Sequence, residues 1–320
     1  DLERAEAVLL RQTSADAFIA LLGDKRFLFS DDGAAFLMYG QRGRSWVALF
    51  DPVGPRATWS ELVWRFIETA HASGGRAVFY QVSPQALPLY LDAGLRVFKL
   101  GEEALVQLAN FDLKGSRRAN LRHSVNRAER AGLRFEIIER AAVPAHLPAL
   151  RAVSDAWLTA HATREKGFSI GGFTDTWLAR QPVAAVWEGE RIVAFASLLL
   201  PALLFEASID LMRQLPDAPN GTMDFLFVRL LLAARERGYQ QFNLGMAPMS
   251  GMVAHPLGPR WQRFGRLVIQ PVPHSLMRLR LHRLGNHIGV KKDHSSLIGS
   301  AGLFTFTSSR ISKSSFVRPI

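Results

Sequence analysis

The stretch from residue 206 to residue 251 constrains the fold more than any other part of the chain. It contains a strand, a loop rich in proline and glycine, a long helix and a second strand. Asp210 lies in the first strand, which ends at Arg213, and Asn243 lies at the end of the second strand. A helix that connects two strands in this way is typical of an α/β protein, whose ligands usually bind at one end of the sheet. We therefore predict an α/β fold with a site near these polar residues.

The boundaries of the long helix are readable from its flanking residues. Thr222 follows Asn220-Gly221 and is a favourable N-cap, and Asp224 would then lie in the first turn, where the helix dipole favours a carboxylate. Gly238 supplies the residue that ends the helix. The free N–H groups at the start of such a helix are suited to binding an anion.

Composition excludes several classes of site. The chain of 320 residues has no cysteine, so it has no disulfide, thiolate or cysteine-bound zinc, and its nine histidines show no HExxH spacing. We expect no metal and no cofactor. The longest apolar run, residues 192–205, is too short to cross a bilayer and contains Pro201. We expect a module without a membrane-spanning segment of its own.

The two halves of the chain repeat one pattern weakly. In each half, strands lead to a helix, then to glycine, and then to a buried strand, at Gly74-Gly75 and at Gly238. This repetition predicts two similar domains in tandem. We place them at residues 1–111 and 133–270, with a connecting helix at 112–132 and a separate tail at 271–320.

The connecting segment is strongly basic and has an apolar stripe at helical spacing, formed by Leu121, Val125 and Ala128. Such a charged helix is commonly a solvated linker. It also suits a phosphate backbone, and the pattern alone leaves both interpretations open. The candidate phosphate-binding or tRNA-binding residues are Lys114, Arg117, Arg118, Arg122 and Arg127.

Several motifs together resemble one family. They include LLGDKRFLFS (21–30), DPVGP (51–55), KGSRRANLRHSVNRAERAG (114–132), EKGFSIGGF (165–173), SIDLMRQLPDAPNGTMDFLF (208–227) and FNLGMAPMSG (242–251). In this order, over about residues 1–267, the chain resembles the catalytic domain of aminoacyl-phosphatidylglycerol synthases, the multiple peptide resistance factor family.

The resemblance implies a fold, a reaction and partners. The fold would be two tandem GNAT-type domains joined by the basic helix. The enzyme would transfer an aminoacyl group, lysyl or alanyl, from aminoacyl-tRNA to the glycerol hydroxyl of phosphatidylglycerol. It would work at the cytoplasmic face of the bacterial inner membrane, and it would lower the negative charge of that membrane and raise resistance to cationic peptides. Family members usually carry an N-terminal transmembrane flippase domain, which we expect this chain to lack.

The residues suit that chemistry. Attack of an alcohol on an ester needs a base and donors for the oxyanion. Asp210, in an apolar strand, is the candidate base, and Arg213 is a candidate phosphate ligand. The candidate substrate-binding residues are Thr222, Asp224, Asn243 and Ser169.

Structural interpretations stand beside these assignments. Asp210 and Arg213 would also suit a structural ion pair with each other. Asn243 would also suit a residue that only satisfies the hydrogen-bonding groups of a strand edge. Asp224 would also suit a carboxylate that only interacts favourably with the helix dipole. Ser169 would also suit a residue that only forms a turn. Two other functions also stand as alternatives: an acyl-CoA N-acyltransferase of the same fold, and an inactive RNA-binding or membrane-binding remnant. The long, proline-interrupted loop after Arg213 argues against coenzyme A, since that fold binds pyrophosphate with a short glycine-rich loop.

The tail departs from the resemblance. Residues 271–320 contain eight Lys or Arg and one acidic residue, which leaves +4 of the net charge of +11 for residues 1–270. The aromatic, lysine-rich segment and Trp-Glu-Pro motif of the family are missing there. We predict a poorly ordered tail, explained by a frameshifted or mispredicted end of the sequence, and an impaired site.

Overall fold

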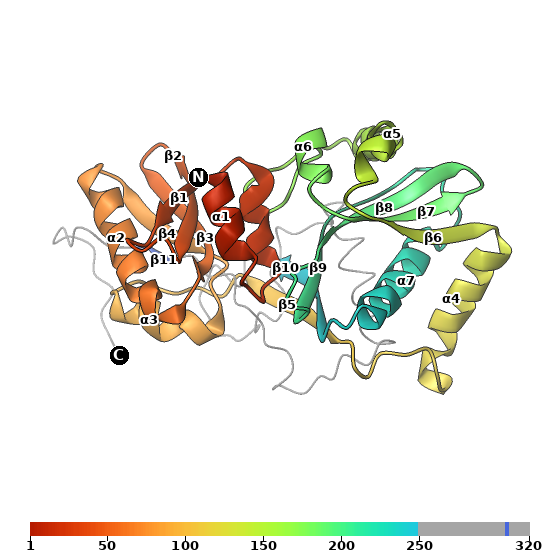
Figure 1. Cartoon of the computed structure of the whole chain (residues 1–320), viewed down its shortest axis with the longest axis horizontal. Helices are drawn as coiled ribbons and strands as arrows, with labels where there is room; N and C mark the ends of the chain where they lie inside the picture. The colour runs from red at the N-terminus through yellow and green to blue at the C-terminus, as the bar shows by residue number, and fades with distance from the viewer. Residues whose placement is uncertain (249–304, 307–320) are drawn as a thin grey trace, which may run out of the picture. The chain divides into compact units, whose positions relative to one another are not determined.

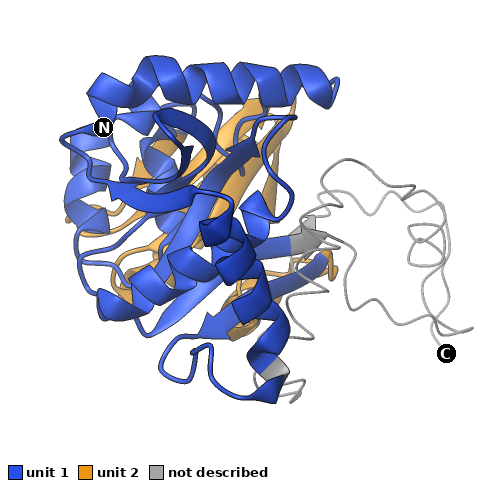
Figure 2. Cartoon of the chain, turned by 90° about the vertical axis from the view of Figure 1, so that its right-hand side faces the viewer, with its two compact units in different colours: residues 1–25, 101–300 blue, residues 26–100, 301–320 orange. Residues whose placement is uncertain are grey.

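The computed structural model describes residues 1–248 and 305–306 and forms two compact units (Figure 1). The larger unit contains residues 1–25 and 101–300, and the smaller unit contains residues 26–100 and 301–320, as the two colours in Figure 2 show. No helix among the described residues has the length and apolar character needed to span a membrane.

The larger unit is built on one six-stranded sheet with the strand order β5-β10-β9-β8-β7-β6. Strands β6 to β9 form an antiparallel meander, and β9 and β10 are parallel. The strands are β5 (Gly101–Gln107), β6 (Leu133–Ile138), β7 (Val183–Glu188), β8 (Arg191–Leu199), β9 (Glu206–Gln214) and β10 (Gln241–Pro248). The helices are α1 (Leu2–Leu9), the 3-10 helix η1 (Asp16–Leu22), α4 (Ala119–Arg130), α5 (Val143–Ala160), α6 (Asp175–Leu178) and α7 (Thr222–Glu236).

Helix α7 makes the crossover between the parallel strands β9 and β10. It is apolar on most sides, and nine of its residues are buried. A helix of this kind is stable only when neighbours cover it, and α7 packs against strands β6 to β10 and against α4. Figure 1 shows α5 and α6 on the other side of this sheet. Side chains of β9 that point toward α5 and α6 are therefore separated from α7 by the sheet.

The smaller unit has a second sheet with the order β1-β2-β3-β4-β11. Strands β1, β2 and β3 are antiparallel, and β3 and β4 are parallel and joined through α2. Phe66, Phe79 and Tyr90 are fully buried in its core. The elements are β1 (Arg26–Phe29), β2 (Phe36–Arg42), β3 (Ser45–Val53), α2 (Trp59–Ala72), β4 (Arg76–Tyr80), α3 (Leu87–Asp92) and β11 (Thr305–Phe306).

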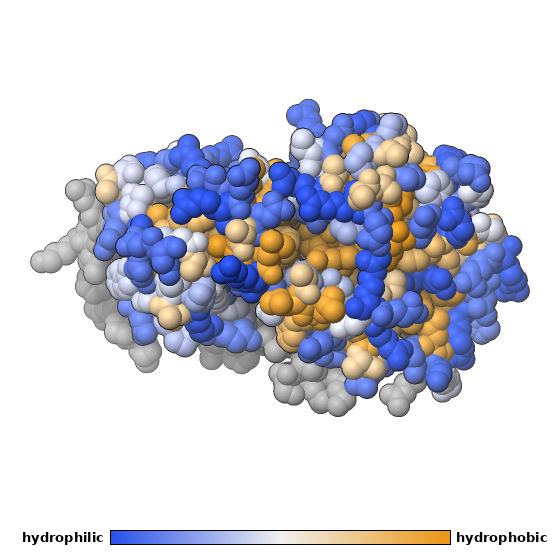
Figure 3. All heavy atoms as spheres, viewed as in Figure 1, coloured by the Kyte–Doolittle hydropathy of each residue, from blue (hydrophilic) through white to orange (hydrophobic). Residues whose placement is uncertain are grey.

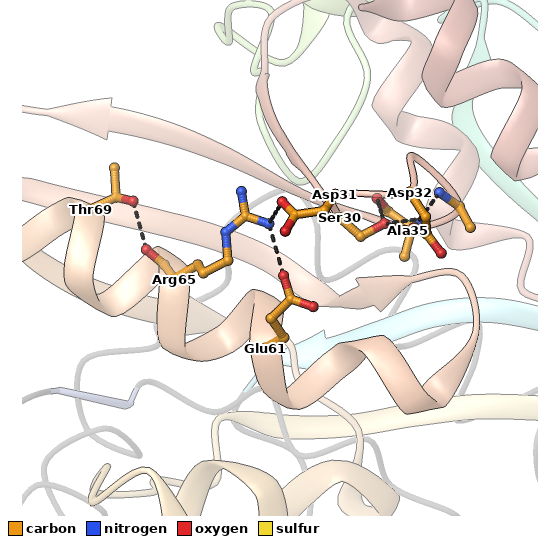
Figure 4. A network of polar contacts seen from close by, with 8 residues as sticks. Ser30, Asp31, Asp32, Ala35, Glu61, Arg65 and Thr69 are labelled. Atoms are coloured by element: carbon orange, nitrogen blue, oxygen red, sulfur yellow. Dashed lines mark hydrogen bonds and ion pairs between the residues drawn. The ribbon is translucent and has the colours of Figure 1, made fainter.

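A polar network fixes the turn between β1 and β2 (Figure 4). Ser30 donates a hydrogen bond to Asp32 over 2.6 Å and accepts one from the amide of Ala35 over 3.0 Å. Arg65 on α2 bridges Asp31 and Glu61 at 2.9 and 3.0 Å. Such exposed pairs add little stability individually, so we assign this network a structural role in the turn.

The predicted α/β class is confirmed. Both units contain an antiparallel meander and one parallel strand pair joined by a crossover helix, but their similarity as tandem domains stays a prediction. The predicted boundary of the first domain lay at residue 111. The compact units divide the chain at residues 25 and 100, because β5 pairs with β10 and so belongs to the larger sheet. The predictions for the tail, residues 271–320, lie outside the described residues except for the two residues of β11.

Candidate active site

Strands β9 and β10 diverge where the candidate site begins. Their parallel pairing covers only residues 206–208 of β9 and 241–243 of β10. Beyond this point β10 continues along β5, whereas β9 continues along β8. Asp210 and Arg213 both follow the divergence on β9. In open α/β sheets, ligands commonly bind outside the carboxyl ends of the strands, and Asp210 and Arg213 lie toward that end of β9.

A β-bulge in β9 sets the directions of Asp210 and Arg213. Ala196 of β8 pairs with Met212 and Leu198 pairs with Ile209, so Asp210 and Leu211 together face Ser197. The hydroxyl of Ser197 accepts a hydrogen bond from the amide of Leu211 over 2.9 Å. In a regular strand, side chains three residues apart point to opposite faces, and one extra residue restores them to the same face. Both side chains are indeed held by the chain segment 154–177.

Asp210 is a half-buried carboxylate with a donor on each oxygen. The amide of Gly171 donates to Oδ1 over 2.7 Å, and the indole Nε1 of Trp177 donates to Oδ2 over 2.9 Å. Burial raises the pKa of Asp210, and the two hydrogen bonds together with the charges of Lys25 and Arg213 oppose that rise. A carboxylate poised in this way is suited to accepting a proton from a substrate hydroxyl.

Arg213 is buried, with 5% of its surface exposed, and is ion-paired with Glu165. Its two terminal nitrogens donate to the two carboxylate oxygens of Glu165 over 2.6 and 2.7 Å. Nη1 also bonds the hydroxyl of Ser154, and the guanidinium lies 5.4 Å from the ring centre of Trp157. Arg213 therefore pairs with Glu165 rather than directly with Asp210. A phosphate that accepted two hydrogen bonds from Arg213 would need the terminal nitrogens that already bond Glu165.

The segment 165–172, which we name the strap, covers this part of β9. Glu165 holds it to Arg213, Gly171 holds it to Asp210, and the amide of Phe168 donates to Oδ2 of Asp24 over 2.7 Å. Ser169, a predicted substrate ligand, is half-buried within the strap, two residues before Gly171. The structure thus brings Ser169 into the neighbourhood of Asp210 through the backbone.

The start of α7 differs from its prediction. The N-cap is Gly221, with φ of 93°, and Thr222 is the first helical residue, so the prediction that Thr222 caps this helix is wrong. The Thr222 side chain is buried, and its hydroxyl donates to the carbonyl of Pro219 over 2.6 Å. A glycine is needed at 221 because this backbone conformation disfavours a side chain. Asp224 lies in the first turn and is half-buried.

Asn243 belongs to a buried polar cluster beside the divergence. Its Nδ2 donates to Asp16 over 3.1 Å and to Glu103 over 2.7 Å, and its carbonyl accepts from the hydroxyl of Ser208 over 3.0 Å. The pKa of Asp16 is raised well above its usual range. The main cause is burial, and the negative charges of Glu103 and Glu206 contribute less. No group of acidic or histidine side chains in residues 1–248 and 305–306 has the geometry to hold a metal ion.

The basic residues around α4 have different surroundings. Lys114 is exposed, and the guanidinium of Arg118 lies 5.3 Å from the ring centre of Phe111. Arg122 donates to the carbonyl oxygens of Leu113 and Gly115, the latter over 2.7 Å, so it fixes the turn before the helix. For Arg117, the structure describes only the backbone, in a 3-10 turn. These residues therefore do not form one uniform basic face.

Arg127 lies at the start of α7. A β-carbon on Gly221 would lie 3.1 Å from its Nη2 atom. Figure 3 shows predominantly hydrophilic residues over the α4 side of the larger unit. An exposed guanidinium next to the positive end of a helix is an arrangement that favours an anion.

Four residues that act on Asp210 or Arg213 were not among the predicted site residues. Lys25, Gly171 and Trp177 act on Asp210, and Glu165 pairs with Arg213. Two family-like motifs, LLGDKRFLFS at 21–30 and EKGFSIGGF at 165–173, contain three of them, so the motifs marked the region without showing which side chains meet. Trp177 lies outside the quoted motifs, and its contact with Asp210 is the result of tertiary packing.

Comparison with known proteins assigns the family. Residues 6–275 match the family model described as phosphatidylglycerol lysyltransferase, C-terminal. The chain is 42% identical over 254 residues to phosphatidylglycerol lysyltransferase of Bacillus subtilis (strain 168), a match that covers 79% of this chain and 29% of that protein. The same enzyme of Staphylococcus aureus (strain MRSA252) is 38% identical over 232 residues, which cover 72% of this chain and 27% of that protein. The chain belongs to the family of phosphatidylglycerol lysyltransferase C-terminal domains.

Two solved structures share the fold. L-PGS from Bacillus licheniformis matches with a TM-score of 0.80 and 33% identity, covering 97% of this chain and 93% of that one. A C-terminal domain of a protein described as a lysylphosphatidylglycerol synthetase from Agrobacterium fabrum matches with a TM-score of 0.78 and 44% identity, covering 95% and 90%. The chain thus spans nearly all of these solved domains but less than a third of the curated relatives.

Proposed function

We propose that this chain transfers an aminoacyl group from aminoacyl-tRNA to the glycerol hydroxyl of phosphatidylglycerol. Membership in the lysyltransferase family supports this reaction and favours lysine as the amino acid. The observation that carries the proposal within the chain is Asp210. It is a carboxylate of raised pKa, oriented by two donors, at the point where β9 leaves β10.

The proposed reaction is a transesterification in which Asp210 acts as the base. Asp210 accepts the proton of the lipid hydroxyl while the hydroxyl oxygen attacks the carbonyl carbon of the aminoacyl ester. The tetrahedral intermediate then collapses, the bond to the terminal ribose oxygen of tRNA breaks, and that oxygen takes the proton.

The remaining site residues have proposed roles consistent with their positions. Arg213 and Glu165 fix the strap, and Ser169 lies on that strap two residues before Gly171. Asn243 shapes the buried wall of the site through Asp16 and Glu103. Asp224, in the first turn of α7, remains a candidate contact for the amino group of the aminoacyl moiety.

The proposed partners follow from the substrates. The tRNA would contact the side of the unit that carries α4, where Lys114 and Arg127 are exposed. The lipid would be reached at the cytoplasmic face of the membrane, with a transmembrane flippase domain as the neighbouring partner that the family resemblance implies.

The test is a transfer assay with the complete chain, charged tRNA and phosphatidylglycerol vesicles. Lysyl-tRNA and alanyl-tRNA are supplied in parallel, and a ninhydrin-positive lipid is the expected product, with lysine preferred. The Asp210→Asn variant is expected to be slower by about 10² to 10⁴-fold. Asp217→Asn, which changes an exposed carboxylate on the loop after β9, is the matched control. Acetyl transfer from acetyl-CoA without any lipid product would support the acyltransferase alternative instead.

A further inference from the structure

The turn before β1 contains a buried lysine, paired with a more exposed aspartate, that the proposed reaction does not yet use. The side chain of Lys25 is fully buried, and its ammonium donates to the carbonyl of Ile19 over 3.1 Å and to Oδ1 of Asp24 over 2.6 Å. Burying an ammonium group costs several kcal/mol unless charged and polar partners compensate it. A lysine that served only solubility would keep its charge in water. The position of this charge therefore requires an explanation.

Asp24 connects the buried lysine to the strap. Its second oxygen, Oδ2, accepts the amide of Phe168 over 2.7 Å, and Nζ of Lys25 lies 6.0 Å from the ring centre of Phe168. Phe168 has a φ of 69°, a conformation that disfavours a bulky residue and needs support from its surroundings. Three residues further along, Gly171 donates its amide to Asp210. Two carboxylates, Asp24 and Asp210, thus hold the same short segment.

We propose that Lys25 is a positioning residue of the active site, which fixes the strap through Asp24 and favours the ionised form of Asp210 by its charge. This inference rests on the proposed role of Asp210 as the base. Within the part of the chain that the structure describes, the charges that act on Asp210 are those of Lys25, from the turn after η1, and Arg213, from β9 itself. Lys25 is paired with Asp24, and Arg213 is paired with Glu165. The positive charge of Lys25 opposes the effect of burial on the pKa of Asp210.

The proposal distinguishes Lys25 from a residue with a merely structural role. A structural lysine could be removed with a loss of stability and no change in the titration of Asp210. A positioning lysine changes that titration, because removing a nearby positive charge disfavours the ionised carboxylate. Asp24 has the opposite sign, so its removal favours the ionised carboxylate. The two substitutions must therefore shift the titration in opposite directions.

The indole of Trp177 provides a readout that needs no substrate. Its Nε1–H bonds directly to Oδ2 of Asp210, so its ¹H–¹⁵N resonance follows the protonation of that carboxylate. The resonance is assigned by its loss in Trp177→Phe, and its pH titration is then recorded in the complete chain. We expect a higher titration midpoint in Lys25→Met than in the wild type. We expect an unchanged midpoint in Arg26→Met, which removes an adjacent exposed cation, and a nearly unchanged midpoint in Lys25→Arg.

A second variant keeps the test decisive if Lys25→Met does not fold. Asp24→Asn preserves an oxygen that accepts the Phe168 amide but removes the negative charge, and we expect it to lower the midpoint. A midpoint unchanged in Lys25→Met, or unchanged or raised in Asp24→Asn, would overturn the proposal. If the transfer assay forms no aminoacyl lipid, the proposed function fails, whereas the Trp177 titration still reports on the link between Lys25 and Asp210.

Discussion

Gly171 and Asp210 lie in such close contact that no side chain fits at position 171. The amide of Gly171 donates to Oδ1 of Asp210 over 2.7 Å, and a β-carbon on Gly171 would lie 1.8 Å from Oδ2. That β-carbon would also come within 2.8 Å of Nε1 of Trp177. The glycine is needed for this close approach, since it lets the strap backbone reach the carboxylate while Trp177 binds the other oxygen.

Gly171→Ala is therefore expected to displace Asp210 without removing it. A displacement of about 1 Å in a reacting group lowers the rate by about 10²-fold, and we expect a loss of this size in kcat for aminoacyl transfer. Gly167→Ala is the matched control in the same strap, because its β-carbon would approach only the carboxylate of Asp24, at 3.2 Å. Equal activities of the two variants would show that the strap does not position Asp210.

The main elements of the site were predictable from local sequence. The strand with Asp210, the loop and helix α7 follow from hydrophobic patterning and from glycines at both helix ends, although the N-cap was placed one residue late, at Thr222 instead of Gly221. Helix boundaries depend on which side chain bonds the first turn, and the Thr222 hydroxyl bonds Pro219 instead. Local sequence therefore gives the element but not its exact cap.

The contacts of the site were not predictable in the same way. The bulge opposite Ser197 depends on the register between two strands, which no local pattern specifies. Gly171 is 39 residues from Asp210, and Glu165 is 48 residues from Arg213. Arg213 pairs with Glu165 because the strap brings a carboxylate to it, whereas sequence reasoning considered only Asp210 on the same strand.

The Arg213–Glu165 ion pair is expected to stabilise the larger unit. Arg213 is 5% exposed, so Glu165→Gln would leave its guanidinium with weaker compensation. Because 34% of the Glu165 side chain is exposed, solvent reduces the cost, and we expect the free energy of unfolding to fall by about 1 to 2 kcal/mol. Denaturant titrations measure this change. Glu136→Gln, which breaks the exposed pair with Arg134, is expected to change stability by less than about 0.5 kcal/mol, and a similar loss in both variants would contradict the prediction.

The buried cluster around Asp16 predicts a pH dependence of stability. The pKa of Asp16 is raised in the folded chain, so folded Asp16 holds a proton that the unfolded chain releases above its ordinary pKa of about 4. The free energy of unfolding should therefore decrease as pH rises from that value toward the raised pKa. Asp16→Asn preserves hydrogen-bonding groups toward Asn243 and Ser208 but cannot ionise, so its stability should decrease less over this range.

Denaturant titrations at a series of pH values measure this difference. Asp155→Asn, an exposed substitution on α5, is the control and should follow the wild-type pH dependence. If the curves of Asp16→Asn and the wild type remain parallel, the Asp16 side chain does not release a proton on unfolding.

The basic residues around α4 predict a salt dependence that separates nucleic-acid binding from a solvated linker. Arg127 is exposed beside Gly221 at the start of α7, where an RNA phosphate would meet both its guanidinium and the helix N-terminus. Arg127→Ala should lower the slope of log affinity for tRNA against log salt concentration by about one unit. Arg134→Ala, which removes an exposed cation from β6, should leave the slope unchanged.

Arg122 is expected to behave differently from Arg127, although both residues are basic and lie on the same helix. Its guanidinium already bonds the carbonyl oxygens of Leu113 and Gly115, so Arg122→Ala should destabilise the turn before α4 and lower the thermal midpoint. Arg127→Ala should leave the thermal midpoint nearly unchanged, because its side chain is exposed. Filter-binding or fluorescence titrations at several salt concentrations measure the slopes. If Arg127→Ala leaves the slope as it is in the wild type, Arg127 does not contact tRNA phosphate, and the helix returns to the solvated-linker interpretation.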